Sequence, residues 1–542
     1  MAIRKLLVAN RGEIAARIFR TCDRLGIATV AVAAPDDAGA FHTRRAAETV
    51  AVQSYLDPGE HVRAARAAGA DALHPGYGFL AESAELAEAV VGAGLTWVGP
   101  PPDVIRAAGD KLAAKQIAAG AGVPVVPTGS PEEVGFPLMI KAAAGGGGRG
   151  MRVVRNRDEL DAAVEAARRE AKAGFGDDTV FFERFVERPR HVEIQLLADA
   201  HGTVVHLGER DCSLQRRHQK VIEESPSPAL DDALRAAMGD AAVRIGEALG
   251  YVGAGTAELL LAGDGSFAFL ELNARIQVEH PVTEAVTGLD LVEHQLRIAS
   301  GEPLESHVAD RSRAGPIGHA IEARLYAEHP LTFLPQAGRV ERLRLPEGVR
   351  VDAGVEAGDD VPVAYDPLLA KLVTHGETRD EALDLLRAAL AETHVGGVTT
   401  NLAFLRWSVR HPAFRAGEVT TAFLDEHPPL SRPVSTRRPW ADGFRLNTAA
   451  VAGGRPPVVE DHAHCVAAGG GTERAVVAPM PGTVIRVLAG EGAAVAAREP
   501  LVVLEAMKME TPLAAPFDAT VLRVLVSEGD RVAGGEILVE LA

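Results

Sequence analysis

A gap-free internal repeat at the C-terminal end is the feature that most constrains how this 542-residue chain can fold. Residues 478–505 align with residues 515–542 at a fixed offset of 37, and 15 of the 28 paired positions are identical. In both copies, short runs rich in Val and Leu are separated by Gly and Pro, which predicts strands and turns. Two copies of one small β unit are expected to pack about a pseudo-two-fold axis, because each can then bury a face that it cannot bury alone. Lys508 lies between the copies and is expected at an exposed hairpin tip.

A lysine at a hairpin tip is ordinarily a solvated charge, and its position alone favours that interpretation. The sequence around it, Met-Lys-Met at 507–509 with Pro-Met-Pro-Gly at 479–482, resembles the biotinyl domain. Lipoyl domains share that fold but usually carry Asp-Lys-Ala at the tip, so the flanking methionines favour biotin. The resemblance implies an all-β carrier domain at 474–542, with biotin joined to Lys508 by a biotin protein ligase.

Lysine is scarce in this chain, because only eight of the 56 Lys and Arg residues are lysines. Where a composition favours Arg, a remaining lysine is more often needed as a compact ammonium or an acylatable amine. Lys141 and Lys220 lie in the two most unusual local sequences of the first 450 residues, which marks them as candidate functional residues. The eight are Lys5, Lys111, Lys115, Lys141, Lys172, Lys220, Lys371 and Lys508.

Composition excludes several classes of protein. The net charge of −18 argues against non-specific nucleic-acid binding. Three scattered cysteines, Cys22, Cys212 and Cys465, are too few for a disulfide framework or a zinc site, which favours a reducing, cytoplasmic location. No apolar run of 18 residues and no apolar N-terminal signal segment exist, so neither a membrane span nor secretion is expected.

At this length the chain is expected to fold as three or four domains. Alternating strand and helix patterns to about residue 99 predict a parallel α/β subdomain. Strands around a glycine run follow, with a helix at 157–173, and an α+β segment continues to about residue 424. A Pro-, Gly- and Ala-rich stretch then predicts a mobile linker. The expected units are 1–110, 111–320 with a lid at about 122–197, 321–445, the linker at 446–473, and the carrier domain at 474–542.

The glycine run follows an apolar strand at 138–140 and Lys141, and it precedes a strand at 151–154. Glycines let backbone N–H groups approach phosphate oxygens, and a lysine adds positive charge. The run lacks the Gly-Lys-Ser/Thr of a Walker A loop and the context of a Rossmann fingerprint. A flexible hairpin loop is the plain alternative, but the pattern resembles the lid of the ATP-grasp fold. The glycines are Gly145, Gly146, Gly147, Gly148 and Gly150.

Residues 271–279 alternate polar and apolar residues without exception. A strand here would project Glu271, Asn273, Arg275, Gln277 and Glu279 from one face. A solvent-facing sheet side explains most such patterns. Glu258, however, lies one hairpin upstream, and pairing across the turn at 263–265 would bring its carboxylate close to that of Glu271. Two carboxylates and an amide are hard oxygen ligands, suited to Mg²⁺ that bridges nucleotide phosphates.

Five segments together resemble the biotin carboxylase family: 9–15, 74–80, 141–150, 210–220 and 271–280. The resemblance covers about residues 1–445, and with the biotinyl domain nearly the whole chain. It implies a Rossmann-like N-terminal subdomain, an ATP-grasp region with a glycine-rich lid, and a C-terminal subdomain. Two departures stand out. Ala274 replaces a common Thr and should be silent, whereas Arg184 replaces a frequent Lys and could alter the geometry of the adenine site.

The resemblance implies a role for each matching residue. Glu279 would be the general base that takes the proton of bicarbonate, so that its oxygen can attack the γ-phosphate of ATP. Arg350 would stabilise the biotin enolate, although its ordinary local sequence fits a surface arginine as well. The ATP-binding set would be Lys111, Lys141, Gly145, Gly146, Gly147, Gly148, Glu183, His191, Gln215 and His218. Bicarbonate would contact Lys220, Arg275, Gln277 and Val278, and Mg²⁺ or Mn²⁺ would contact Glu258, Glu271 and Asn273.

The residues outside these regions are too few for a carboxyltransferase, so the chain resembles the α subunits of acyl-CoA carboxylases. Such a subunit would hand its carboxyl group to a separate carboxyltransferase, which selects the acyl-CoA, and would pair with its own copies through the carboxylase region. Methylcrotonyl-CoA, geranyl-CoA and 2-oxoacid carboxylases are alternatives. A different ATP-grasp ligase with a lipoyl-like module and a silent scaffold are further ones, and the complete charged set argues against the scaffold.

Overall fold

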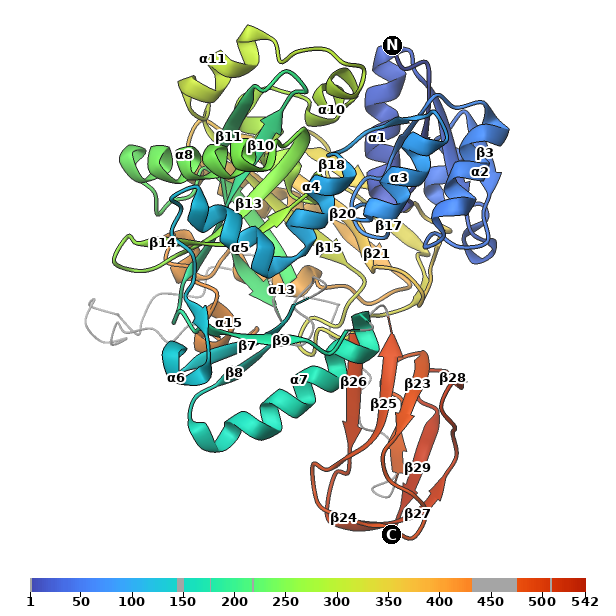
Figure 1. Ribbon diagram of the computed structural model, residues 1–542. Coiled ribbons are helices and arrows are strands. Elements are labelled where there is room, and N and C mark those ends of the chain that lie inside the picture. The colour runs from blue at the N-terminus through green and yellow to red at the C-terminus, as the bar shows by residue number, and fades with distance from the viewer. Residues whose placement is uncertain (1, 144–150, 176, 217–218, 431–474, 507–508) are drawn as a thin grey trace, which may run out of the picture.

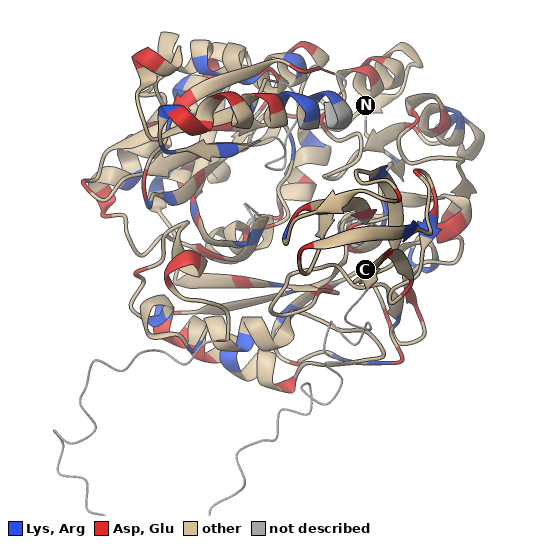
Figure 2. Cartoon of the chain, turned by 90° about the horizontal axis from the view of Figure 1, so that it is seen from below, with Lys and Arg blue, Asp and Glu red and all other residues tan. Residues whose placement is uncertain are grey.

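The computed structural model describes residues 2–143, 151–175, 177–216, 219–430, 475–506 and 509–542. Figure 1 shows a large α/β body and an all-β domain at the C-terminal end. Acidic and basic residues are interspersed over both parts, as Figure 2 shows. Within the described ranges, no helix has both the length and the apolar character that crossing a bilayer requires. The linker expected at 446–473 lies outside the described residues.

The N-terminal part is a five-stranded parallel sheet in the order β3-β2-β1-β4-β5. Apolar strand residues such as Leu7, Val30 and Leu73 are completely buried under the surrounding helices. This arrangement confirms the predicted Rossmann-like subdomain. The strands are β1 (Lys5–Val8), β2 (Ala28–Ala33), β3 (Glu48–Ala51), β4 (Ala72–His74) and β5 (Thr96–Trp97). The helices are α1 (Gly12–Leu25), α2 (Pro58–Ala68), α3 (Ala84–Gly92) and α4 (Pro102–Gly109).

A small four-stranded sheet, in the order β6-β9-β7-β8, forms the lid. Strands β7 and β8 pair antiparallel, which confirms the strands predicted on either side of the glycine run. The four glycines at 145–148 lie outside the described residues. The lid elements are β6 (Thr128–Gly129), α6 (Pro131–Val134), β7 (Leu138–Ala142), β8 (Arg152–Val154), α7 (Leu160–Phe175) and β9 (Val180–Arg184).

An eight-stranded antiparallel sheet, in the order β14-β13-β10-β11-β12-β15-β20-β18, forms the centre of the body. Strand β10 belongs to this sheet, although the lid was expected to extend to residue 197. The boundary expected at residue 320 lies inside β15, so one sheet carries residues from both sides of it. The strands are β10 (Arg190–Ala198), β11 (Val204–Arg216), β12 (Gln219–Ser225), β13 (Gly253–Leu261), β14 (Phe267–Asn273), β15 (His319–Tyr326), β18 (Arg350–Ala353) and β20 (Leu368–Gly376).

Helices cover this sheet and bury its apolar side chains. Helix α8 packs on β10 and β11, α12 packs on β15 and β20, and α9 lies across four strands from β11 to β20. The helices are α5 (Lys111–Gly120), α8 (Asp232–Leu249), α9 (His280–Thr287), α10 (Leu291–Ala299), α11 (Ser306–Ala314), α12 (Arg379–Glu392), α13 (Leu402–Ser408), α14 (Pro412–Arg415) and α15 (Phe423–Glu426). Short strands β16 (Gly338–Arg339) and β19 (Asp360–Val361), and β17 (Arg342–Arg344) and β21 (His394–Gly396), pair separately.

The C-terminal domain consists of two four-stranded sheets, β22-β29-β27-β24 and β26-β25-β23-β28. Each copy of the repeat contributes one short strand to the sheet formed mainly by the other copy: β24 pairs with β27, and β28 pairs with β23. Equivalent residues Val484 and Val521, and Leu501 and Leu538, share one core. The predicted mutual burial of the two copies is therefore confirmed. The strands are β22 (Ala475–Val477), β23 (Gly482–Val487), β24 (Ala494–Val495), β25 (Pro500–Ala506), β26 (Met509–Ala514), β27 (Ala519–Val524), β28 (Arg531–Val532) and β29 (Ile537–Leu541).

The predicted hairpin is present on both sides of its tip. Strands β25 and β26 pair antiparallel up to Ala506 and Met509. Lys508, the predicted site of biotin attachment, lies with Met507 outside the described residues.

Candidate active site

The ammonium of Lys220 contacts three buried carboxylates at the centre of the eight-stranded sheet. Its Nζ lies 2.6 Å from Glu258 Oε1 and 2.8 Å from Glu279 Oε1, and it also pairs with Glu193. Burial alone would lower the pKa of Lys220, but the three negative charges hold it well above its ordinary value. The group is therefore a permanent cation, and two of its three carboxylates are shared with other cations, Glu193 with Arg210 and Glu279 with Arg324.

Strand order explains how these residues meet. Glu271 on β14 lies opposite Glu258 on β13, and Glu258 lies opposite Glu193 on β10. Directly opposed residues of antiparallel strands project from the same face, about 4.5–5.5 Å apart. Lys220 reaches the same face from β12, two strands away from β10. The predicted pairing of Glu258 with Glu271 across a hairpin is confirmed.

Glu279 lies between two cations. One carboxylate oxygen accepts from Lys220, and the other accepts from the guanidinium of Arg324, also at 2.8 Å. Burial would raise the pKa of Glu279, but Lys220 and Arg324 hold it well below the ordinary value of a glutamate. The side chain is only 1% exposed. It is thus an ionised, water-excluded carboxylate, as a general base requires before proton transfer.

The strand predicted over 271–279 is wrong beyond Asn273. Strand β14 ends there, and residues 274–279 form a loop that leads into α9. Ala274 and Ile276 are buried in the hydrophobic core, so the alternation of sequence reflects an extended loop pressed against that core. The chain then enters the helix at His280, with Pro281 in its first turn, a position where a missing N–H is tolerated.

Hydrogen bonds connect the polar side chains of this loop to one another and to Glu258. Arg275 donates to Gln277 Oε1 at 2.9 Å and to Asn273 Oδ1 at 3.1 Å, and Asn273 donates to Glu258 Oε1 at 2.9 Å. The amide nitrogen of Gln277 is buried and has no hydrogen-bond partner within the described part of the chain. A buried donor without a partner is costly in a folded protein. It is explained if an anion accepts from it when substrate is bound.

The two predicted metal ligands differ in environment. Glu258 is buried, and His191 Nε2 lies 2.8 Å from its second oxygen. Burial would raise the pKa of Glu258, but Lys220 and then His191 hold it well below the ordinary value. Glu271 is 30% exposed, and its Oε2 lies 3.9 Å from Lys111 Nζ. The pair thus offers one fixed and one accessible carboxylate, a donor set that fits a hard divalent cation.

Two lysines pair with one buried carboxylate at the base of the lid. Glu183 on β9 is 2% exposed and pairs with both Lys141, at 2.5 Å, and Lys115. Burial would raise the pKa of Glu183, but the two ammonium groups lower it. Asp110 caps α5 by accepting from the N–H groups of residues 112 and 113, which fixes Lys111 at the first position of that helix. Lys141 and Lys115 thus share one buried carboxylate, and Lys111 lies near Glu271.

Two of the residues predicted for the adenosine pocket, His191 and Gln215, are linked through polar contacts to Glu258, which contacts Lys220. Gln215 Nε2 lies 2.8 Å from His191 Nδ1, and His191 in turn contacts Glu258. His218 lies outside the described residues.

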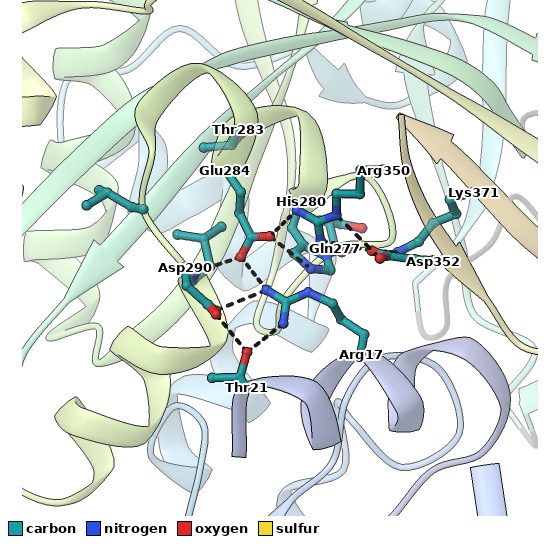
Figure 3. Close-up of polar contacts among 12 residues, drawn as sticks. Arg17, Thr21, Gln277, His280, Thr283, Glu284, Asp290, Arg350, Asp352 and Lys371 are labelled. Atoms are coloured by element: carbon teal, nitrogen blue, oxygen red, sulfur yellow. Dashed lines mark hydrogen bonds and ion pairs between the residues drawn. The ribbon is translucent and has the colours of Figure 1, made fainter. Parts of the chain in front are cut away.

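Arg350 is separate from this centre. It pairs with Glu284 at 2.7 Å and with Asp352 at 2.8 Å (Figure 3). It also borders a cavity of about 840 Å³. Burial would lower the pKa of Arg350, but the two carboxylates hold it above the ordinary value. Arg350 thus has fixed partners, Glu284 on α9 and Asp352 on β18, whereas its role toward biotin stays a prediction.

Several residues of the centre carry no motif in the sequence. Glu193, Arg324 and Lys115 each contact a predicted site residue, yet they lie in strands or helices of ordinary composition. The scarcity of lysine was a usable signal for Lys115. Glu193 and Arg324 have no such signal, because only the strand order brings them to Lys220 and Glu279.

The fold and this charged centre define an ATP-grasp ligase joined to a carrier domain. Four family models match successive segments of the chain. They are the biotin carboxylase N-terminal domain at 2–105, the ATP-binding domain of the carbamoyl-phosphate synthase L chain at 110–307, the biotin carboxylase C-terminal domain at 322–426, and the domain of biotin-requiring enzymes at 474–541.

Known proteins resemble the chain over most of its length. The biotin-dependent acyl-coenzyme A carboxylase alpha3 subunit of Mycobacterium leprae is 44% identical over 568 residues, covering 94% of each chain. The mitochondrial methylcrotonoyl-CoA carboxylase subunit alpha of Dictyostelium discoideum is 46% identical over 447 residues, which cover 78% of this chain but 64% of that protein. The chain belongs to the biotin carboxylase family of ATP-dependent ligases.

A solved structure shows the same fold. The biotin carboxylase domain dimer of the 2-oxoglutarate carboxylase of Hydrogenobacter thermophilus, in complex with MgADP, ADP and bicarbonate, has a TM-score of 0.76 and 40% identity. The similarity covers 79% of this chain and 98% of that one.

Proposed function

We propose that the chain carboxylates biotin joined to its own Lys508, with ATP and bicarbonate as substrates and Mg²⁺ as the metal. As the α subunit of an acyl-CoA carboxylase, it then passes the carboxyl group to a separate carboxyltransferase subunit. The observation that carries this proposal is the position of the Lys220 ammonium among three carboxylates, on the same sheet face as the loop that holds Gln277. The ammonium of Lys220 and the amide of Gln277 would hold a small anion beside the ionised carboxylate of Glu279.

Bicarbonate would bind between Lys220 and the loop. The guanidinium of Arg275 and the unpaired amide of Gln277 supply N–H donors, and the backbone of Val278 completes the seat. Hydrogen bonds from cations to an anion are roughly twice as strong as neutral ones, so two cations suit a substrate that must be held with its reactive oxygen exposed.

Glu279 would take the proton of the bound bicarbonate. In the structure the pKa of Glu279 is low because Lys220 and Arg324 both contact it. When an anion draws Lys220 toward itself, Glu279 loses part of this stabilisation, and its pKa rises. Binding of the substrate thus makes the carboxylate a better base. The bicarbonate oxygen would then attack the γ-phosphate, the bond to the β-phosphate oxygen would break, and carboxyphosphate and ADP would form.

ATP would lie between the sheet and the lid. Lys111 and Lys141, together with the glycines at 145–148, would face the phosphates, and Glu183 would lie toward the adenosine. Glu258 and Glu271, with Asn273 beside them, would hold Mg²⁺, which neutralises charge on the phosphate oxygens when bound. His191 would keep Glu258 in place, since it contacts the second carboxylate oxygen.

Biotin attached to the carrier domain would bind beside Arg350. Its ureido nitrogen would be the nucleophile. The guanidinium of Arg350 is held by Glu284 and Asp352, so its position is fixed before the reaction. A fixed cation aimed at developing negative charge lowers the barrier without reorganisation.

The M. leprae relative supports the role as an acyl-CoA carboxylase α subunit, because the similarity covers 94% of both chains. The D. discoideum relative makes methylcrotonyl-CoA carboxylation the second candidate. We further propose a cytoplasmic location from the cysteine content, and pairing of two copies through the carboxylase body from the dimeric structural relative. A panel of acyl-CoA substrates, assayed with each candidate carboxyltransferase, distinguishes the two classes.

Two measurements test the central proposal. Intact mass of the purified protein, produced with a biotin protein ligase, is expected to show one biotin per chain. ATP hydrolysis is expected to depend on bicarbonate and to rise with added free biotin. Hydrolysis that ignores both bicarbonate and biotin would contradict the proposal, even if the carrier domain were modified.

A further inference from the structure

Lys371 lies directly behind the loop that holds Gln277 and Glu279. It is on β20 and completely buried, and its Nζ donates to the carbonyl oxygen of Val278 at 2.9 Å. Figure 3 shows its side chain reaching toward Asp352, which also pairs with Arg350. Neither the sequence motifs nor the roles proposed above assign it a function.

The sheet places Lys371 between Arg324 and Asp352. Its neighbour across β15 is Arg324, which contacts Glu279. Its neighbour across β18 is Asp352, which pairs with Arg350. A lysine in this row is therefore next to the residue that holds the proposed base and next to the residue that holds the proposed biotin contact.

An ammonium at this position is expensive to bury. Removing a charge from water costs several kcal/mol unless close partners compensate. Glu13 Oε2 lies 3.2 Å and Asp352 Oδ2 lies 3.9 Å from Nζ. Burial raises the pKa of Glu13 to about 7, and Lys371 opposes that rise. An apolar side chain would fill the same space in the sheet without any of these charges, so packing alone does not explain a lysine here.

The hydrogen bond acts on one peptide group. Because a peptide group is planar, a donor that fixes the Val278 carbonyl also fixes the N–H and Cα of Glu279 on the other side of the bond. The preceding peptide is held too, since His280 Nδ1 lies 2.7 Å from the carbonyl oxygen of Gln277. The two consecutive peptides that carry Gln277, Val278 and Glu279 are thus anchored from behind.

We propose that Lys371 is a positioning residue for bicarbonate: its ammonium holds the Val278 carbonyl and thereby sets the backbone that presents Gln277, Val278 and Glu279 to the substrate. This inference rests on the proposed function of the same site. Glu13 and Asp352 are the carboxylates next to this ammonium, and Glu13 reaches it from the Asn-Arg-Gly-Glu segment at 10–13.

The test compares three variants of the full-length biotinylated protein. Lys371→Met removes the hydrogen bond, Glu13→Gln removes a counter-ion but leaves that bond, and the double variant removes both charges together. In Lys371→Met we expect the KM for bicarbonate to rise about 10- to 100-fold, the size of losing a hydrogen bond from a charged group, with the KM for ATP unchanged. Glu13→Gln is expected to stay within about threefold of wild type, because the bond remains.

The double variant separates positioning from folding. It leaves no unpaired buried charge between residues 13 and 371, so its melting temperature is expected to be closer to wild type than that of Lys371→Met, while its KM for bicarbonate stays high. A normal KM for bicarbonate in the double variant overturns the inference, as does an unfolded double variant or an equal rise in the KM for ATP. Equal defects in Glu13→Gln and Lys371→Met also overturn it. Absence of bicarbonate-dependent turnover in wild type would instead contradict the proposed function.

Discussion

Replacing Glu279 with Gln separates general-base chemistry from the binding of bicarbonate. The substitution keeps the size of the side chain and removes its charge. In the structure, each carboxylate oxygen accepts one hydrogen bond of 2.8 Å, from Lys220 and from Arg324. A glutamine amide retains one oxygen acceptor but turns N–H donors toward the other cation, so one of the two bonds is lost.

The structure allows the effect on stability to be compared with the effect on rate. Losing one hydrogen bond to a charged group costs about 1.5–3 kcal/mol. Neither cation becomes unpaired, because Lys220 keeps Glu193 and Glu258, and Arg324 keeps Glu223 at 2.6 Å. Removal of a general base costs about 10²- to 10⁴-fold in rate, or about 3–5 kcal/mol in the barrier. We therefore expect a folded protein with little turnover.

The pH dependence of stability follows from the lowered pKa of Glu279. A carboxylate with a folded pKa below its unfolded value stabilises the fold at pH above about 4.3, and this contribution is lost as pH falls through the folded pKa. The difference in melting temperature between wild type and Glu279→Gln is therefore expected to be full at pH 7 and to shrink in acid. A difference that grows in acid would show that Glu279 is not held ionised.

The assay measures kcat and the KM for bicarbonate, using free biotin as acceptor. Glu279→Gln is expected to bind ATP and bicarbonate but to lose turnover. Arg275→Ala removes a cation that faces the anion, so its KM for bicarbonate should rise well above that of Glu279→Gln. Normal turnover of Glu279→Gln at saturating substrates would refute the reasoning, because another group would then take the proton.

Two further substitutions test the carrier and the metal pair. Lys508→Arg is expected to abolish biotin attachment and transfer to the carboxyltransferase while carboxylation of free biotin survives, since arginine has no acylatable amine; streptavidin blotting and free-biotin turnover measure both, and a biotinylated variant would contradict it. Glu271→Gln is expected to lower kcat and to raise the Mg²⁺ concentration needed for half-maximal activity, because it removes a charged oxygen ligand. An unchanged Mg²⁺ requirement would show that Glu271 is an ordinary solvent-facing residue.

The parts of the fold that the sequence predicts best are those built from contacts close along the chain. The 37-residue repeat predicted how the carrier domain buries its core, and the strands around residue 260 predicted the pairing of Glu258 with Glu271. The sequence predicts a strand over 274–279, because polar and apolar residues alternate in a strand and can also alternate in a loop that packs on the core. The structure distinguishes them, because β14 ends at Asn273 and α9 begins at His280.

The residues that sequence reasoning missed depend on strand order. Glu193, Arg324 and Lys371 lie on β10, β15 and β20, which are far apart along the chain and become part of one face only because the sheet runs β10-β11-β12-β15-β20. From the sequence alone, a charged residue in a predicted strand is expected to face solvent, because its neighbours on the adjacent strands are not known. No local periodicity contains that information.

This sheet order also explains why the site needs so many charges. Lys220, Arg324, Lys371 and Arg350 lie on four strands of one sheet, and each is paired with at least one carboxylate that is fixed by the backbone. Four free cations would repel one another and bind any anion. Lys220 and Arg324, which are neutralised by carboxylates and lie next to the loop of Gln277, would bind an anion only where it can replace a carboxylate contact and accept from the Gln277 amide, which has no partner among the described residues. Selectivity for a small substrate anion therefore follows from the carboxylates as much as from the cations, which is why the loss of Glu279 and the loss of Arg275 are expected to differ.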